Sequence, residues 1–324
     1  MLTTTVNFSD VKNAVDKIKA TENSFYVKSA GQFKKNKAIL SDYHNYSKYG
    51  LSACGSRLGF PATFIVKHGD KHPETASKII SECYGDFLAK AKASTNNRTS
   101  KALFIRTFSN VIYGVLTDKY SIFDDDEVVS LIEASDYLMK AEEFWYDVSP
   151  EHFHARFVSP DTLDFDGDSS PLHFCVFIDN SMVGESSLRI RFGLYRSACT
   201  NGCIFGLKEF EIAKEVHRGQ RDYVAILAEA LSKCDEYEET LKQAVEQMAM
   251  TKSSIYELPD EVALSYLRDK LSVSDKVSRR IFEIYNTNYG DTQWSLCNAI
   301  TEYAHEVENI SERIRLERLA VNVA

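Results

Sequence analysis

Three neighbouring segments between residues 152 and 198 carry the hydrophobic patterns of β-strands, and they constrain the fold more than any other part of the chain. HFHARFVS (152–159) and SSLRIRFGLYRSA (186–198) alternate apolar with polar residues, so each is expected to bury one face. LHFCVFID (172–179) is nearly all apolar, as a buried central strand is. Together they predict an antiparallel sheet in the middle of the chain.

A second group of strand patterns precedes this sheet. KALFIRTF (101–108) and NVIYGVLTD (110–118) are rich in β-branched and aromatic residues, and Ser109-Asn110 separates them, which is typical of a hairpin. SFYVKS (24–29) and AILSDY (38–43) are shorter strand candidates nearer the N-terminus. The β-structure is therefore expected to extend beyond the central segments.

Helical patterns lie on the N-terminal side of the sheet. Residues 10–19 predict a short amphipathic helix, and residues 51–94 read as helical, with Pro73 suited to the first turn of a helix. Asp124 to Asp126 precede another helical pattern, where carboxylates can cap free backbone N–H groups. The acidic triplet also leaves a divalent-ion site open, although no second carboxylate group follows at a matching spacing.

From about Gln220 the pattern is helical to the end. An apolar stripe at three- and four-residue spacing runs from residue 224 to 248 and predicts one helix of roughly eight turns. The stripe fits packing inside its own domain, and it also fits a seam between two copies of the chain. Three further helices are expected to start near Asp260, Ser274 and Asp291.

These patterns predict an α+β protein with a helical N-terminal region, a central antiparallel sheet and a largely helical C-terminal half. We divide the chain into residues 1–98, residues 99–219 and residues 220–324, and we expect 99–324 to pack as one domain. The polar segment STNNRTS (94–100) is the first clear connector.

Composition narrows the function classes. No run of about 18 apolar residues occurs, so no membrane partner is expected, and we place the protein in the cytoplasm of a bacterial host. Its seven cysteines are scattered, which favours reduced thiols. With 38 basic and 47 acidic side chains the net charge is −9, which opposes nonspecific attraction to a phosphate backbone. A nucleic-acid site must therefore be local.

The stretch CTNGC (199–203) allows three interpretations. Asn201-Gly202 is a strong turn signal after an alternating strand, because both residues tolerate positive φ. A zinc site would use Cys199 and Cys203, but a second Cys or His pair at ligand spacing is missing nearby. A nucleophilic cysteine would need a base such as His217, which no sequence signature places there.

Two further patterns bear on metal chemistry. Asp164, Asp166 and Gly167 match part of a calcium loop, but His173 stands where that loop requires a glutamate, so we interpret the segment as an acidic loop between strands. His152 and His154 share one face of a strand without an evident third ligand. We expect no cofactor. The motifs of phosphate loops, hydrolase elbows and zinc proteases do not occur, which disfavours an enzyme.

A basic and aromatic strand face is the remaining functional candidate. Alternation places Arg189, Arg191 and Tyr195 of the 186–198 strand on one face, and the candidate set also includes Arg156 of the first strand and the neighbouring Arg196. A second basic cluster lies at Arg313, Arg315 and Arg318. Arginines bind phosphates and tyrosine can stack on bases. The alternative is that each arginine pairs with one of the acidic residues of the chain.

Several motifs resemble a known family. VGESSLRIRFGLYRSACTNGCIFG (183–206), VIYGVLTDKYSIFDDDEVV (111–129), HRG (217–219) and TQWSLCNAITEYAHE (292–306) are similar, in this order, to the phage- and plasmid-associated family catalogued as domain of unknown function 932. The resemblance covers roughly residues 50–320. Thr117 in place of serine and Lys119 in place of arginine are mild departures. The resemblance implies a mobile-element setting and no defined reaction.

Three function hypotheses follow. The first is a non-catalytic protein that binds single-stranded nucleic acid in recombination or replication, and three strands followed by a long helix are analogous to the core of phage single-strand annealing proteins, which form oligomers. The second is a module that engages a host or mobile-element protein, in which a homo-oligomer is one arrangement. The third is a metal-dependent hydrolase that uses the histidines and the carboxylates of residues 161–168.

Overall fold

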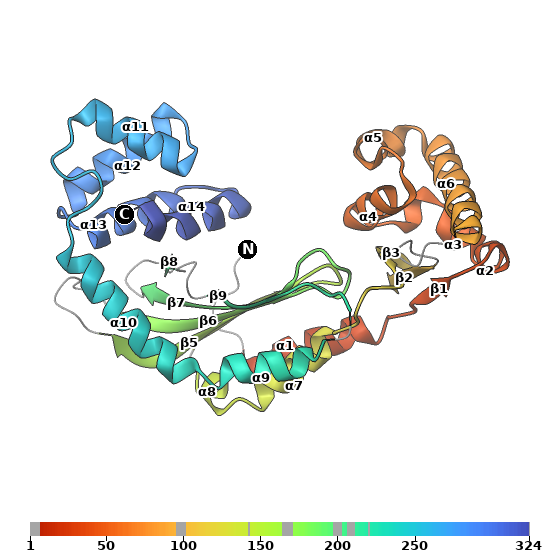
Figure 1. Cartoon of the computed structure of the whole chain (residues 1–324), viewed down its shortest axis with the longest axis horizontal. Coiled ribbons are helices and arrows are strands. Elements are labelled where there is room, and N and C mark those ends of the chain that lie inside the picture. Colours follow the sequence, from red (N-terminus) through yellow and green to blue (C-terminus); the bar gives the residue numbers. More distant parts are fainter. Residues whose placement is uncertain are drawn as a thin grey trace.

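The computed structural model describes residues 7–94, 102–141, 143–163, 171–196, 203–205, 211–219 and 221–323. These residues form an α+β protein, as the sequence predicts. Figure 1 shows three parts arranged as an open C: a central sheet with the helices beneath it, an N-terminal lobe at one end, and a group of C-terminal helices at the other.

The central sheet is antiparallel and has the three predicted strands at its centre. Its strands are β4 (Glu143–Val148), β5 (Phe153–Leu163), β6 (Leu172–Asn180), β7 (Leu188–Arg196), β8 (Cys203–Phe205) and β9 (Glu211–Glu215). The order is β4-β5-β6-β7-β8, and β9 pairs with the first half of β7. Sequence alternation therefore found β5, β6 and β7 and missed β4, β8 and β9.

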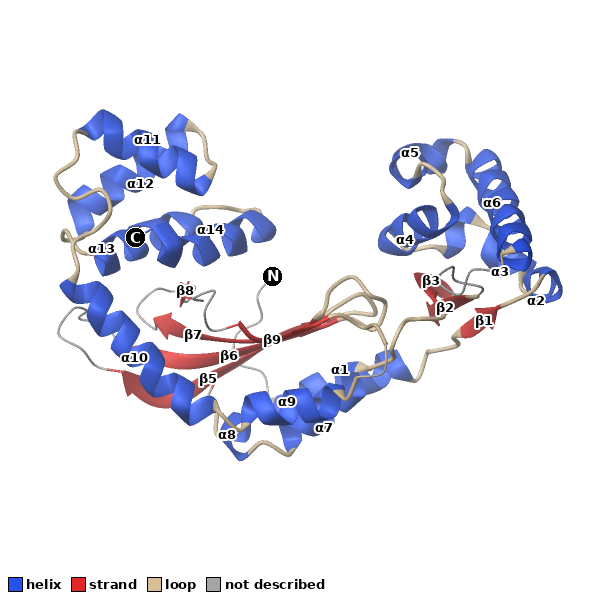
Figure 2. Cartoon of the chain, viewed as in Figure 1, coloured by secondary structure: helices blue, strands red, loops and turns tan. Residues whose placement is uncertain are grey.

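One face of this sheet is apolar and covered by helices. Along β7 the four predicted inward residues, Leu188, Ile190, Phe192 and Leu194, are fully buried, which confirms the face assigned to them. The covering helices, seen below the sheet in Figure 2, are α1 (Phe8–Lys19), α7 (Asp125–Glu133), α8 (Asp136–Met139), α9 (Tyr223–Leu231) and α10 (Cys234–Met250). The opposite face is partly covered by α14 (Ile310–Val323), which contacts β8.

The N-terminal lobe is a small sheet covered by helices. Its strands are β1 (Phe25–Val27), β2 (Leu103–Phe108) and β3 (Val111–Thr117), in the order β1-β2-β3. Its helices are α2 (Ala30–Lys35), α3 (Lys37–Ser41), α4 (Lys48–Leu58), α5 (Ala62–His68) and α6 (Pro73–Ala93), with short 3₁₀ turns η1 (Tyr43–Asn45) and η2 (Gly69–Lys71). Helix α4 packs so closely on β3 that a Cβ on Gly50 would lie 2.1 Å from the carbonyl oxygen of Ile112. Strand β1, which precedes the helices of the lobe, pairs with β2, which follows them, so both belong to one sheet.

The hairpin and the helix starts follow the sequence signals. Ser109 and Asn110 both have positive φ, as the turn between β2 and β3 requires. Helix α6 begins at Pro73, and the backbone N–H of Asp124 donates to Oε2 of Glu127 (3.0 Å) at the start of α7. The acidic triplet therefore acts as the predicted helix cap.

The C-terminal helices are α11 (Asp260–Leu271), α12 (Asp275–Asn288), α13 (Gln293–His305) and α14 (Ile310–Val323). They share one apolar core with the central sheet, and Trp294 of α13 is nearly fully buried in it. The predicted starts at Asp260 and Ser274 are confirmed, and the third start is at Thr292, which caps α13. Among the described residues, no helix is long and apolar enough to span a bilayer.

Three predictions about elements are wrong. AILSDY (38–43) is not a strand, because residues 37–41 form α3. The predicted eight-turn helix is divided into α9 and α10. Between them, the hydroxyl of Ser232 donates to the carbonyl oxygen of Glu229 (2.8 Å). The helix predicted to start near Asp291 also forms two helices, α13 and α14. The side chain of Asn309 accepts the backbone N–H of Glu312 and so caps α14.

The apolar stripe of residues 224–248 packs inside its own chain. Leu227, Leu231, Leu241 and Val245 are buried in the core between the sheet and the C-terminal helices. Only Val224, at the first turn of α9, is exposed among the stripe's apolar residues. The interpretation as a seam between two copies of the chain is therefore wrong for this stripe.

Candidate functional site

The second face of the central sheet carries two rows of polar and aromatic residues, and α14 lies over part of it, because Glu317 of α14 is close enough to Arg156 for that charge to act on its carboxyl. In the first row, backbone pairing places His154 opposite Asp179, and Asp179 opposite Arg189. Nδ1 of His154 lies 2.7 Å from Oδ1 of Asp179, and Lys214 of β9 continues the row beyond Arg189. These residues alternate along their strands with the buried apolar residues, so they stand on the sheet face opposite that apolar core.

The second row brings aromatic rings beside arginines. Trp145 pairs with Arg156, Arg156 with Phe177, and Phe177 with Arg191. The guanidinium carbon of Arg191 lies 5.6 Å from the centre of the Phe177 ring, and its Nη2 donates to Oδ2 of Asp179 (2.5 Å). Asp179 therefore holds both His154 and Arg191.

The pKa values of Asp179 and His154 follow from the contacts that Asp179 makes with both His154 and Arg191. Burial favours the neutral acid, yet the hydrogen bond from His154 and the charge of Arg191 outweigh it and lower the pKa of Asp179. Burial also opposes the imidazolium, but the hydrogen bond and charge of Asp179 raise the pKa of His154. His154 therefore keeps its proton, and its positive charge on the sheet face, to a higher pH than an unpaired histidine does.

The predicted basic residues divide into groups. Arg156, Arg189 and Arg191 lie on the same sheet face, and Nε of Arg189 donates to the hydroxyl of Ser187 (3.1 Å). The backbones of Tyr195 and Arg196 belong to β7, while their side chains lie outside the described residues. The pairing alternative holds for Arg191 with Asp179, Arg313 with Glu317 (2.9 Å) and Arg315 with Glu312 (2.5 Å), and the charge of Arg156 also acts on Glu317. The side chain of Arg318 is not described.

The candidate metal ligands do not form a ligand group in the described part of the chain. His152 and His154 stack with ring centres 4.8 Å apart, and His173 contacts the carbonyl of Ser159 (3.0 Å). No three His, Cys, Asp or Glu side chains among the described residues are grouped as ligands of one ion. Asp164, Asp166 and Gly167, and the CTNGC stretch up to Gly202, lie outside the described residues.

A buried charge cluster, which sequence reasoning missed, joins the N-terminal lobe to the central sheet. Arg106 of β2 is fully buried, its Nη1 donates to Oδ1 of Asp124 (2.8 Å), and its Nη2 lies 2.9 Å from Oε1 of Glu22. Lys19 of α1 also bonds Asp124. Burial alone would raise the pKa of Asp124, but Arg106 and Lys19 lower it.

The family-like motifs meet beside this cluster. The ring of His217, from the HRG motif, stacks between Tyr120 (5.3 Å) and Tyr223 (5.4 Å), and burial lowers its pKa to about 4. Asp125 accepts a hydrogen bond from Nδ2 of Asn180 (2.8 Å), and burial raises its pKa to about 7. Asp125 and Asn180, 55 residues apart, and Tyr120 and His217 thus meet at one junction, which brings the 111–129 motif and the HRG motif together in space.

The N-terminal lobe holds a concentration of positive charge. Residues 28–94 contain 11 lysines and arginines against 5 acidic residues, a net charge of +6. All 11 are exposed, and within the described part of the chain none forms an ion pair with a carboxylate: Lys28, Lys34, Lys35, Lys37, Lys48, Arg57, Lys67, Lys71, Lys78, Lys90 and Lys92. A count of local charge along the sequence would have found this surface.

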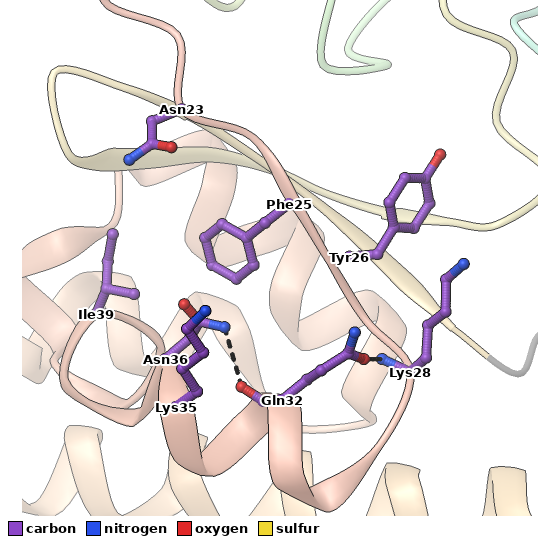
Figure 3. Close-up of a pocket in the computed structure, with 8 residues that line it drawn as sticks. All are labelled: Asn23, Phe25, Tyr26, Lys28, Gln32, Lys35, Asn36 and Ile39. Atoms are coloured by element: carbon purple, nitrogen blue, oxygen red, sulfur yellow. Dashed lines mark hydrogen bonds between the residues drawn. The ribbon is translucent and has the colours of Figure 1, made fainter.

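A cavity of about 570 Å³ in this lobe is lined by residues of β1, α2 and the segments next to them (Figure 3). Two lysines and three amide side chains line it together with Tyr26, and no carboxylate does: Asn23, Tyr26, Lys28, Gln32, Lys35 and Asn36. Figure 3 shows Phe25 turned toward the α2 side of the strand, while Tyr26 and Lys28 lie on the other side. This lining suits an anionic ligand.

Comparison with known proteins agrees with the motifs. No curated protein and no solved structure matches the chain. Residues 112–321, which include β3, the central sheet and most of the C-terminal helices, match the family described as "Domain of unknown function (DUF932)". Because that match spans more than half of the 324 residues, the chain belongs to the DUF932 family.

Proposed function

We propose that this protein binds single-stranded nucleic acid along the open side of the C, without catalysing a reaction on it. The observation that carries the proposal is charge segregation. Residues 28–94 have a net charge of +6, so the remainder of a chain with net charge −9 carries −15. A polyanion is therefore attracted to the N-terminal lobe and repelled from most of the rest.

The exposed lysines of the lobe suit phosphate contacts. A cation that is already paired must break its ion pair before it can bind a phosphate, whereas the lysines of this lobe have no carboxylate partner in the described part of the chain. Phosphate contacts also release counterions, which supplies much of the affinity of nucleic-acid-binding proteins. The lobe is thus the main electrostatic surface in this proposal.

The polar face of the central sheet supplies the second contact in this proposal. Arg189 donates to a neutral hydroxyl and so keeps its charge available, while Arg191 is oriented by Asp179 beside the ring of Phe177. Aromatic rings interleaved with cations are typical of surfaces that bind single strands, because every base has a flat face to stack. The strand order β5-β6-β7 followed by helices α9 and α10 is analogous to single-strand annealing proteins.

The proposed setting is recombination or replication in a phage- or plasmid-associated context. Fluorescence anisotropy with labelled single- and double-stranded oligonucleotides over a salt series tests the binding itself. We expect tighter binding of single strands and a loss of affinity as salt rises. Absence of binding at low salt, where attraction is strongest, would refute the proposal.

One observation favours a second candidate function, a module that engages a host or mobile-element protein. Three apolar side chains lie exposed between the end of α10 and the first turn of α11, namely Met250 (80% exposed), Leu258 and Val262. A pull-down with the full chain and with Met250→Gln/Val262→Glu distinguishes this function. A partner that is retained by the first and lost by the second would support it, and equal retention would exclude this surface.

A further inference from the structure

The cavity beside β1 has the features of a site for one nucleotide of a single strand. Among its lining residues only lysines carry charge, and the other polar groups are the hydroxyl of Tyr26 and three amides, which can donate to and accept from base edges. The cavity belongs to the N-terminal lobe, ahead of residues 112–321 that match the DUF932 family. It is therefore a feature of this chain beyond the family segment.

Tyr26 gives this surface a stacking platform. Tyr26 is 39% exposed as a residue, and its ring rests on the ring of Phe104, with centres 4.7 Å apart and planes inclined by 25°. Phe104 itself is buried, so it fixes the orientation of Tyr26 before any ligand arrives. A rigid, half-exposed aromatic ring is what base stacking requires.

The cations lie beside that platform. Nζ of Lys28 lies over the Tyr26 ring, 4.8 Å from its centre, so a base that stacks there takes the place of this ammonium group and leaves it for the phosphate. Lys35 lines the same cavity from α2. The loop that carries Lys28 is fixed locally, because the backbone N–H of Lys28 donates to Oε1 of Gln32 (2.6 Å) and the side chain of Asn36 donates to the carbonyl of Gln32 (2.9 Å), as Figure 3 shows. A base on Tyr26 would thus have a phosphate within reach of Lys28.

We propose that this cavity binds one nucleotide of single-stranded nucleic acid, with the base stacked on Tyr26 and the phosphate held by Lys28 and Lys35. This inference rests on the proposed function, since it names where on the N-terminal lobe the strand is held. Asn23 and Asn36 offer amide groups to the base edge. The site is local, so it differs from a diffuse attraction to all eleven cations of the lobe.

Matched charge reversals test the site. Anisotropy with labelled oligothymidine is measured for the full chain, for Lys28→Glu/Lys35→Glu, and for Lys67→Glu/Lys71→Glu, which makes the same charge change at α5 and η2, away from α2 in Figure 1. We expect the first pair to weaken binding at least tenfold more than the second. Neutral Lys28→Gln/Lys35→Gln should reduce the slope of log K against log salt by about 1.4, for two phosphate contacts on a single strand.

Tyr26→Ala, compared with Phe64→Ala at another exposed ring of the lobe, tests the stacking platform. We expect only the first to weaken oligothymidine binding, by roughly tenfold. Equal losses in both lysine pairs would overturn the site while leaving nucleic-acid binding intact, and failure of the unaltered chain to bind at all would overturn the proposed function. Thymidine monophosphate that binds as tightly as the oligonucleotide would show that the cavity takes a free nucleotide, and would overturn the strand assignment.

Discussion

Arg106 and Asp124 form an ion pair at 2.8 Å that ties the sheet of the N-terminal lobe to the first turn of α7. Around it, Met182 and Val183 from the loop between β6 and β7 pack with Phe108. The two parts of the C are thus joined by a buried charge pair and a small apolar cluster. This junction, and not the sheet face alone, sets how the two proposed contact surfaces lie relative to each other.

Removal of Arg106 should strongly destabilise the fold. Arg106→Ala leaves the carboxylate of Asp124 buried with only Lys19 as partner, and loss of one partner of a buried pair costs about 3–5 kcal/mol. The free energy of unfolding, from urea denaturation, measures it. Arg57→Ala, at an exposed residue of the same lobe, should change that free energy by less than about 0.5 kcal/mol. Equal effects of the two substitutions would contradict the role of the junction.

The buried carboxyl of Asp125 should make stability fall as pH rises. Its pKa is about 7 in the folded chain and near 3.9 when unfolded, so between these values the folded state holds a proton that the unfolded state releases. Its contribution is complete below about pH 4 and lost as pH rises to about 7, with a slope of up to about 1.4 kcal/mol per unit. The lowered pKa of His217 contributes with the opposite sign.

Asp125→Asn isolates this contribution. Oδ2 of Asp125 and Oδ1 of Asn180 have no hydrogen-bond partner, and a substituted amide would supply a donor there. We expect urea denaturation between pH 5 and 8, analysed as the difference between the variant and the unaltered chain, to show that the variant gains relative stability as pH rises. A difference that is constant with pH would mean that Asp125 is ionised throughout.

Arg189→Glu should weaken nucleic-acid binding without unfolding the protein. Within the described part of the chain its side chain bonds the neutral hydroxyl of Ser187 and no carboxylate, so reversal of its charge leaves no buried acid unpaired. We expect a roughly tenfold loss of affinity for single strands by anisotropy, with an unchanged circular dichroism spectrum. Arg279→Glu, an exposed residue of α12, is the matched control and should have a small effect.

Arg191→Glu should behave differently from Arg189→Glu. It would place a second carboxylate beside Asp179, which Arg191 now holds at 2.5 Å, so we expect a lower melting temperature as well as weaker binding. Thermal denaturation followed by circular dichroism separates the two effects. A melting temperature equal to that of the unaltered chain would mean that the ion pair contributes little to the fold.

Two glycines in helices of the N-terminal lobe should respond oppositely to alanine. In Gly50→Ala the new Cβ would overlap the backbone of β3, so we expect a loss of more than about 2 kcal/mol in the free energy of unfolding. In Gly85→Ala of α6 nothing lies within 4 Å of the new Cβ, and higher helix propensity should add about 0.5–1 kcal/mol. Urea denaturation of both variants measures the contrast.

The sequence predicts well what depends on neighbours along the chain. The alternation of Leu188, Ile190, Phe192 and Leu194 correctly assigned the buried face of β7, and Asn110 marked the hairpin turn. It could not reveal contacts between remote residues, such as Asn180 with Asp125, because periodicity carries no information on which elements meet. Whether an arginine is paired is decided by such contacts, as Arg191 and Asp179 illustrate.

The order in which the chain passes through the central part and the N-terminal lobe has a consequence for folding during synthesis. Helix α1 packs on α7 and β4, then the chain leaves to build the N-terminal lobe and returns after β3. The lobe is complete once Thr117 has emerged from the ribosome, whereas α1, made earlier, must wait for partners made later. During translation the first helix therefore spends the longest time with its apolar face uncovered, and that interval is when a chaperone would find it.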